Sequence, residues 1–311
     1  MRILFAATGE IAVPVLETLN KMGLVKAVLT APDAPGKRGK ELLPSPIKVA
    51  ATKLGLPVSS PAHLGSVARL EVSLTGADTL VSFCYGKIFG PKFLSLFSST
   101  YNIHPSQLPK YRGPSPLFET IINQDRECTI SIQKIALECD AGDIFTTYSF
   151  PLDGRETLSS LEERVSHEAA KLSEAFFSSP SSYKSYKQEG SPSYSHMITK
   201  EAGLLDFNKS ASALHATIRA TEKWPKATAL YAGEPIYLTG VSGSGFEIEA
   251  VKCKEAAGTV VSFDKKRGFC IATGEGYLYV NRLQLPARKE MDALSFNNGN
   301  RNFVSSVLRS L

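Results

Sequence analysis

The first half of the chain alternates short apolar runs with helical patterns, and this alternation limits the fold more than any other feature. The runs over Arg2–Ala7, Val25–Ala31 and Asp78–Tyr85 are short and aliphatic, which predicts buried strands. The spacing of apolar residues between these runs predicts helices over Ile11–Met22 and Ile47–Leu54. Strands that alternate with helices predict an α/β domain with a Rossmann-like, doubly wound parallel sheet and ligands at its carboxyl edge.

The second half continues this pattern briefly and then changes character. Alternation over Thr129–Ile135 predicts a strand, and helical spacing over Thr157–Phe177 predicts a long helix with Thr157 as its N-cap. The segment Ser178–Ser195 is rich in Ser, Pro, Gly and Lys, which is typical of a linker or an extended crossing segment. After a short helix near Ala211–Ala220, short Gly-punctuated segments predict a small all-β barrel or sandwich.

Length and charge both favour two domains. A chain of 311 residues is long for one hydrophobic core. We predict a first domain over residues 1–190, a linker over 191–207 and a small all-β domain over 208–311. Residues 1–207 hold 21 Lys and Arg and 21 Asp and Glu, whereas residues 208–311 hold 14 and 9. The net charge of +5 therefore lies in the last third, which indicates a polyanionic partner or a basic surface without one.

Composition narrows the compartment and the chemistry. Hydrophobic residues make up 43% of the chain and charged residues 21%, as in soluble globular proteins. No apolar run reaches the roughly 18–20 residues of a membrane span, and the N-terminus begins with a strand pattern rather than a secretory signal. The five cysteines are widely spaced without a CxxC pair, which argues against disulfides and a zinc site. We therefore expect a cytoplasmic protein without a disulfide framework or a zinc knuckle.

Two loops of the first domain contain residue types that can bind phosphate, but each also has a simpler structural interpretation. The turn at Gly9 follows the first strand, but one glycine falls far short of the G-x-G-x-x-G pattern of dinucleotide sites. A plain turn is favoured there, and nicotinamide chemistry is disfavoured. The long loop over Ala31–Lys48 carries Lys37, Arg38 and Lys40, whose charges suit phosphate contacts. From this loop alone, a solvated loop without a ligand remains the simpler interpretation.

Asn102 and His104 give the strongest chemical signal. If they end a strand, their side chains project to the same side, and Pro105 favours extended geometry at His104. Two hydrogen-bond donors side by side suit an oxyanion site. For an Asn-x-His pair by itself, however, a histidine that only caps the strand end is the favoured interpretation. Asp140, in the turn of CDAGDIF, changes this balance because a carboxylate beside an imidazole can orient it or act as a base.

The combination resembles a known family. The motifs that carry the resemblance are Asn102-x-His104-x-Ser106, Leu108-Pro109, Tyr111-Arg112-Gly113 and Asp140-Ala-Gly-Asp143. They are similar to motifs of the formyltransferases that use 10-formyltetrahydrofolate. The loop PDAPGKRGKELLPSPIKVA and the later IRATEKWPKATALY resemble the methionyl-tRNA formyltransferases in particular, and the likeness runs from RILFAAT to FNNG.

The resemblance implies roles that the residues alone do not establish. It implies a Rossmann-like folate-binding domain, an OB-like barrel that contacts tRNA, and Asn102, His104 and Asp140 as the catalytic residues. The folate-contacting loop would comprise Ser106, Gln107, Leu108 and Pro109. Arg38 matches a basic position that the family places near the tRNA acceptor end, and we expect its basic neighbours Lys37 and Lys40 to bind tRNA with it. The implied reaction moves a formyl group from 10-formyltetrahydrofolate to the α-amino group of initiator methionyl-tRNA, in a monomeric protein without a metal.

Some positions depart from the family pattern, and alternatives stay open. Gln107 and Cys139 stand where the family usually has leucine, and Ala34 replaces a basic residue. A formyltransferase for a nucleotide-sugar amine can carry a similar extra domain and is the nearest alternative. A catalytically silent RNA-binding module on the same scaffold is the alternative from another class.

Overall fold

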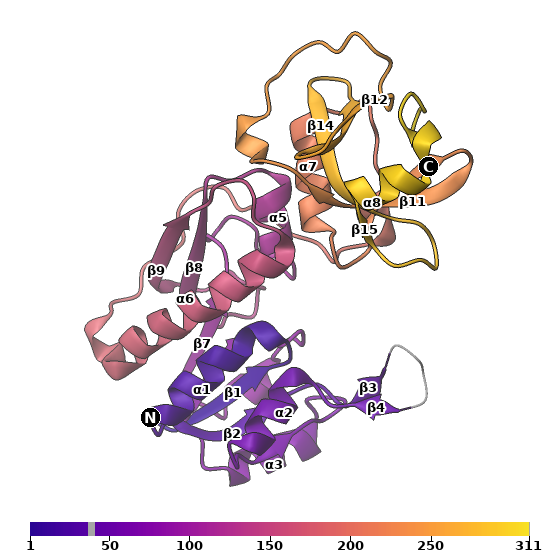
Figure 1. Cartoon of the computed structure of the whole chain (residues 1–311). Helices are drawn as coiled ribbons and strands as arrows, with labels where there is room; N and C mark the ends of the chain where they lie inside the picture. The colour runs from indigo at the N-terminus through magenta and orange to yellow at the C-terminus, as the bar shows by residue number, and fades with distance from the viewer. Residues whose placement is uncertain (37–40, 311) are drawn as a thin grey trace. The chain divides into compact units, whose positions relative to one another are not determined.

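The computed structural model describes residues 1–36 and 41–310, which form two compact units (Figure 1). Unit 1 comprises Met1–Pro116, Cys128–Phe150 and Glu162–His196. Unit 2 comprises Leu117–Glu127, Pro151–Leu161 and the chain from Met197 onward. The predicted domain boundaries at residues 190 and 208 stay predictions.

Unit 1 is built on a seven-stranded sheet in the order β5-β2-β1-β6-β7-β8-β9. Its strands are β1 (Ile3–Ala7), β2 (Val25–Leu29), β5 (Val58–Ser59), β6 (Thr79–Phe83), β7 (Ser99–His104), β8 (Glu127–Lys134) and β9 (Ile144–Pro151). The pairs from β5 to β7 are parallel, which confirms the predicted doubly wound sheet, and β8 joins β7 antiparallel. A small hairpin of β3 (Ala34–Pro35) and β4 (Leu42–Leu43) flanks the undescribed residues.

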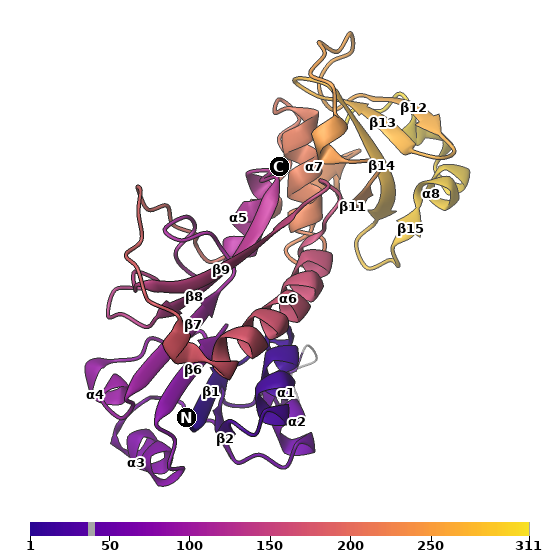
Figure 2. The same ribbon diagram turned by 90° about the vertical axis from the view of Figure 1, so that its left-hand side faces the viewer.

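Helices cover both faces of this sheet. They are α1 (Val13–Lys21), α2 (Pro46–Lys53), α3 (Ser66–Leu74), α4 (Pro91–Leu94) and α6 (Leu158–Ser178), with 3₁₀ turns at Glu10–Ala12 and Pro180–Ser182. Figure 2 shows α1 and α2 on one side of the sheet and α3 and α4 on the other. The chain runs outward from β1 to β5 and then returns to β6, so right-handed crossovers place the helices on opposite faces. The strand order reverses between β1 and β6, where such sheets bind ligands.

Unit 2 contains an antiparallel sheet in the order β10-β11-β14-β13-β12, with β15 beside β14. Its strands are β10 (Ala227–Tyr231), β11 (Glu234–Val241), β12 (Val260–Asp264), β13 (Gly268–Ala272), β14 (Tyr277–Gln284) and β15 (Met291–Asp292). Its helices are α5 (Pro116–Ile122), α7 (Ala211–Ala220) and α8 (Ala293–Gly299), with 3₁₀ turns at Lys200–Gly203, Gly245–Glu247 and Arg301–Phe303.

The end of the chain closes this sheet into a barrel. Arg309 O accepts a hydrogen bond from Leu230 N on β10 at 2.9 Å, and Ser306 O accepts one from Val260 N on β12 at 2.8 Å. Both edge strands are therefore paired with the same terminal segment, which removes the exposed edges of the sheet. The predicted small β domain is confirmed, and of the predicted barrel or sandwich this closure favours the barrel. Phe269, Phe296 and Phe303 are fully buried inside unit 2.

Two buried residues of α7, His215 and Arg219, connect this helix to the chain before α6. Arg219 is 4% exposed, and its Nε donates to His215 Nδ1 at 3.0 Å. Its guanidinium also donates to the backbone oxygen of Glu156 at 2.7 Å. The His215 ring accepts at Nδ1 and is fully buried, so it is held in its neutral form. Burial and the Arg219 charge lower the pKa of His215 to about 3.

This pair predicts acid sensitivity of unit 2. The pKa of His215 is about 3 in the folded chain and about 6.5 in the unfolded chain, which therefore binds one more proton between these values. The stability contribution is complete above pH 6.5 and decreases as pH falls, by up to about 1.4 kcal/mol per pH unit. Trp224 is the single tryptophan and lies in unit 2. Denaturant titrations followed by its fluorescence should show a weaker pH dependence in His215→Gln than in wild type; equal dependences would contradict the assignment.

Within residues 1–36 and 41–310, no helix is long and apolar enough to cross a membrane.

Candidate active site

The site begins where β7 ends. Residues along β7 alternate between the two faces of the sheet, so Asn102 and His104 project to one side. Tyr101 projects to the other, where its ring packs edge-on against Phe176 of α6 at 5.3 Å between centroids. This aromatic contact packs β7 against α6 on the face of the sheet opposite Asn102 and His104. The predicted shared side of Asn102 and His104 is confirmed by their common contact, Asp140.

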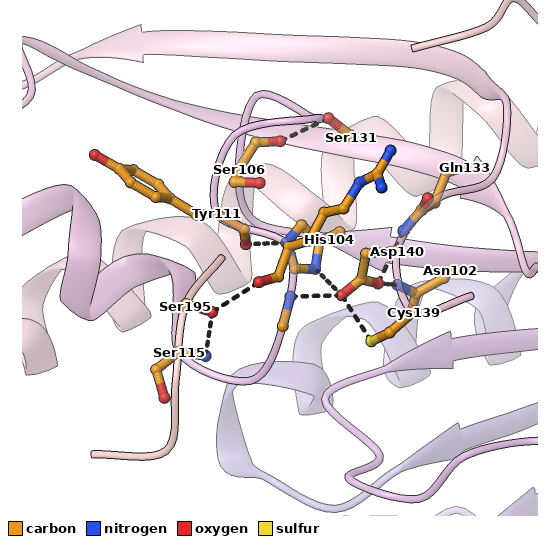
Figure 3. Close-up of polar contacts among 12 residues, drawn as sticks. Asn102, His104, Ser106, Tyr111, Ser115, Ser131, Gln133, Cys139, Asp140 and Ser195 are labelled. Atoms are coloured by element: carbon orange, nitrogen blue, oxygen red, sulfur yellow. Dashed lines mark hydrogen bonds and ion pairs between the residues drawn. The ribbon is translucent and has the colours of Figure 1, made fainter. Parts of the chain in front are cut away.

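Asp140 receives donors on both carboxylate oxygens (Figure 3). Its Oδ1 accepts from Asn102 Nδ2 and from Gln133 Nε2, each at 3.0 Å. Its Oδ2 accepts from the backbone N–H of Gly113 at 2.9 Å and from Cys139 Sγ at 3.3 Å. An ionised carboxylate has about four lone-pair sites, and these four donors use them. The carboxylate is therefore held in one orientation.

His104 lies between a carbonyl and this carboxylate. It is 4% exposed, and its Nε2 lies 3.0 Å from the backbone oxygen of Tyr111. A carbonyl oxygen can only accept, so Nε2 carries a hydrogen. Nδ1 lies 3.6 Å from Asp140 Oδ2, which is longer than an ordinary hydrogen bond. In the neutral ring Nδ1 therefore carries no hydrogen, whereas in the protonated ring a substrate oxygen can compete with Asp140 for the hydrogen on Nδ1.

Cys139 contributes a neutral donor. Cys139 is exposed, but partial desolvation of its thiol and the charge of Asp140 raise the pKa of Cys139 to about 11. The thiol is therefore protonated at neutral pH, as its S–H···O contact to Asp140 requires. A leucine at this position would make no such bond.

Two glycines allow the loops to approach. Gly113 has φ of 114°, and a Cβ there would lie 2.5 Å from Ser195 O. At Gly142 a Cβ would lie 1.8 Å from Lys134 O, the last carbonyl of β8. Both substitutions would displace backbone that carries partners of Asp140.

The predicted folate loop has one exposed side chain, Gln107. Ser106 is 2% exposed, and its Oγ donates to Lys110 O at 2.5 Å while its own carbonyl accepts from Ser131 Oγ at 2.6 Å. Leu108 is buried and Pro109 half-buried. The predicted tRNA-contacting residues Lys37, Arg38 and Lys40 lie outside the described residues. Among the described residues, no group of three or more His, Cys, Asp or Glu side chains could hold a metal ion.

Sequence interpretation missed two residues that contact Asp140 or its turn. Gln133 is 1% exposed on β8, and a polar residue at an inward position of an apolar strand was an available signal. Gln188 lies in the Ser- and Lys-rich segment Ser178–Ser195, where composition gave no signal. After the 3₁₀ turn at Pro180–Ser182 the segment is extended: it pairs with Ile144 through Tyr186 and with Arg112 through Tyr194.

Comparisons with known proteins give the family of the chain. The family model described as "Formyl transferase" matches residues 1–175, and "Formyl transferase, C-terminal domain" matches residues 197–301. A methionyl-tRNA formyltransferase of Borrelia hermsii is 36% identical over 310 residues, covering 99% of each chain. One of Thermotoga sp. is 35% identical, covering 96% of this chain and 95% of its own.

The fold also matches solved structures. An N-formyltransferase from Helicobacter canadensis, in complex with folinic acid and dTDP-3-aminofucose, has a TM-score of 0.65. It is 19% identical and the match covers 90% of this chain and 98% of that one, so it shows the fold alone. The family models and the full-length relatives lead to one conclusion. The chain belongs to the formyl transferase family, among its methionyl-tRNA formyltransferases.

Proposed function

We propose that this chain transfers the formyl group of 10-formyltetrahydrofolate to the α-amino group of initiator methionyl-tRNA. The products are N-formylmethionyl-tRNA and tetrahydrofolate. The meeting of Asn102, His104 and Asp140 at the end of β7 carries the proposal. Full-length similarity to methionyl-tRNA formyltransferases supports the acceptor. The folinic acid bound by the structurally similar Helicobacter enzyme supports the folate donor.

Asn102 and His104 have the chemistry to stabilise the reaction's developing charge. The amine nitrogen attacks the formyl carbon, and the formyl oxygen becomes an oxyanion. An amide nitrogen carries two hydrogens, and the bond from Asn102 to Asp140 uses one of them. The second can reach a substrate oxygen, as can the hydrogen on Nδ1 of a protonated His104. When the bond between carbon and N10 of folate breaks, the amine loses a proton and N10 gains one.

Asp140 orients these donors. Four donors use the lone pairs of the Asp140 carboxylate. We therefore propose that Asp140 positions the Asn102 amide and stabilises the positive charge of a protonated His104. Proton removal from the amine then passes through a water beside the carboxylate, because a His104 ring with hydrogens on both nitrogens has no lone pair to accept one. Of the predicted folate loop, the exposed Gln107 is the side chain we propose to contact folate directly, while Ser106, Leu108 and Pro109 shape the loop.

We propose that basic residues of unit 2 contact tRNA phosphates, together with Lys37, Arg38 and Lys40. The candidates are eight exposed residues: Lys252, Lys254, Lys265, Lys266, Arg267, Arg282, Arg288 and Lys289. Exposed Lys and Arg can neutralise phosphates without reading sequence.

Binding to tRNA is therefore expected to weaken steeply with salt. The double variant Lys265→Ala/Lys266→Ala should lower the slope of log Kd against log salt by about 1–2, since each lost phosphate contact removes about 0.7–0.9. Fluorescence anisotropy of labelled tRNA at several salt concentrations measures the slope. Lys21→Ala, an exposed lysine on α1, is the control and should keep the wild-type slope. A flat salt dependence of the wild type would mean that the basic excess contacts no RNA.

The acceptor is tested by comparing three amines. With 10-formyltetrahydrofolate as donor, charged initiator tRNA should be formylated at least 100-fold faster, in kcat/KM, than charged elongator tRNA or a nucleotide-sugar amine, about 2.7 kcal/mol of discrimination. Faster transfer to the nucleotide-sugar amine would replace the proposal with its nearest alternative.

We also propose a monomeric, cytoplasmic protein. Light scattering that gives twice the mass of one chain would contradict the monomer.

A further inference from the structure

The segment Ser178–Ser195 holds the loops of the active site. Tyr186 exchanges backbone hydrogen bonds with Ile144, at 2.8 and 2.9 Å. Further along, Arg112 N donates to Ser193 O at 2.9 Å, and Ser193 Oγ accepts from Tyr111 N at 2.9 Å. The carbonyl of Tyr111 is the one that faces His104. A segment whose composition suggests a passive linker therefore contacts both loops that carry partners of the catalytic residues.

The Gln188 side chain joins these loops through one carboxamide. Its Nε2 donates to the backbone oxygens of Asp140 and Gly142, at 2.7 and 2.8 Å. It also lies 3.3 Å from Gln133 Oε1. Its Oε1 accepts from Arg112 Nε at 3.1 Å and Nη2 at 2.8 Å. Gln188 thus binds the turn on both sides of residue 141 and ties it to the loop of Arg112 and Gly113.

Asp140 needs such support because of its backbone. It has φ of 51°, in the left-handed region that residues other than glycine seldom adopt. Such conformations persist where the surroundings fix them. Gln188 holds the backbone of this turn, and Gln133 holds the Asp140 carboxylate while itself in contact with Gln188.

We propose that Gln188 is a positioning residue for Asp140, an inference that rests on the proposed formyl transfer. It fixes the turn through the Asp140 and Gly142 carbonyls, and it keeps Gln133 directed at the carboxylate. The two amide hydrogens bind the Asp140 and Gly142 carbonyls and the amide nitrogen contacts Gln133 Oε1, whereas the amide oxygen accepts from Arg112. Displacement of a catalytic group by about 1 Å can cost about 10²-fold in rate.

Two substitutions separate these roles. Gln188→Glu keeps an acceptor for Arg112 but removes the donors to Asp140 and Gly142, and Gln188→Met removes both. Each is expected to lower kcat about 10- to 100-fold, with KM for both substrates within about twofold of wild type. Glu189→Gln changes an exposed neighbour on the same segment and should retain wild-type kcat.

A double-mutant cycle distinguishes positioning from general weakening. Gln133→Met removes the direct donor to Asp140 Oδ1. If both glutamines act through one carboxylate, Gln133→Met/Gln188→Met should lose less kcat than the product of the single losses. Multiplicative losses, or wild-type kcat in folded Gln188→Glu, would overturn the proposal.

One readout does not depend on activity. The N–H of Gly113 donates to Asp140 Oδ2, so its hydrogen exchange should become at least about tenfold faster in Gln188→Met, a loss of about 1.4 kcal/mol of protection. Unchanged exchange would overturn the inference even if the wild type is active. If the wild type transfers no formyl group, the proposed function fails, and Gly113 exchange alone decides whether Gln188 positions Asp140.

Discussion

Asparagine in place of Asp140 is expected to lower kcat about 10²- to 10⁴-fold, in a protein that folds as the wild type does. Asparagine tolerates the left-handed backbone of this position, so the turn can be retained. The change removes the negative charge beside His104 and places an amide group where donors converge. An NH₂ group in place of Oδ2 would face the Gly113 N–H, and in place of Oδ1 it would face two amide nitrogens.

Steady-state kinetics with saturating folate and charged tRNA measure this loss. Glu174→Gln makes the same chemical change at an exposed position of α6 and should leave kcat unchanged. Circular dichroism melting of both variants verifies that they are folded. A turnover within about threefold of wild type for Asp140→Asn would exclude Asp140 from the catalytic group, since charge-assisted catalysis contributes far more.

Alanine in place of Gly142 is expected to destabilise unit 1 by about 2–4 kcal/mol. The added Cβ would lie 1.8 Å from Lys134 O, so either the end of β8 or the Asp140 turn must move. That turn is also joined to β8 by the bond from Lys134 N to Asp143 O, at 2.8 Å. The collision is with backbone, which cannot rotate away as a flexible side chain can.

Thermal unfolding measures this effect, with an expected decrease in Tm of about 5–15 °C. Gly90→Ala is the matched control in unit 1, because a Cβ there has no atom within 4 Å and the backbone φ is −73°. It should change the free energy of unfolding by about 1 kcal/mol or less. Equal melting temperatures for the two variants would mean that the close approach at Gly142 carries no energetic cost.

Local periodicity was enough to predict most of the fold. The helix predicted over Ile47–Leu54 is α2 (Pro46–Lys53), and the strand predicted over Asp78–Tyr85 is β6 (Thr79–Phe83). The helix predicted over Ile11–Met22 begins later, at Val13, after a 3₁₀ turn. The antiparallel position of β8 and the closure of the barrel by residues 305–309 depend on long-range pairing, which periodicity does not encode.

The site was predictable to a smaller extent. Asn102 and His104 share a strand end, so their common side follows from the twofold period of strands. The position of Asp140 beside them was inferred from chemistry alone. The hydrogen bond from Asn102 to Asp140 confirms that position. The supporting glutamines were not predicted, because their roles depend on contacts 46 to 76 residues apart for Gln188 and on burial for Gln133.

Single-turnover formylation tests the central claim most directly. Excess wild-type protein is mixed with 10-formyltetrahydrofolate and labelled initiator methionyl-tRNA, and the formation of N-formylmethionyl-tRNA is followed in time. We expect rapid formation of product by the wild type and a rate constant about 10²- to 10⁴-fold smaller for Asp140→Asn. No product from the folded wild type, or equal rate constants for the two proteins, would contradict the account.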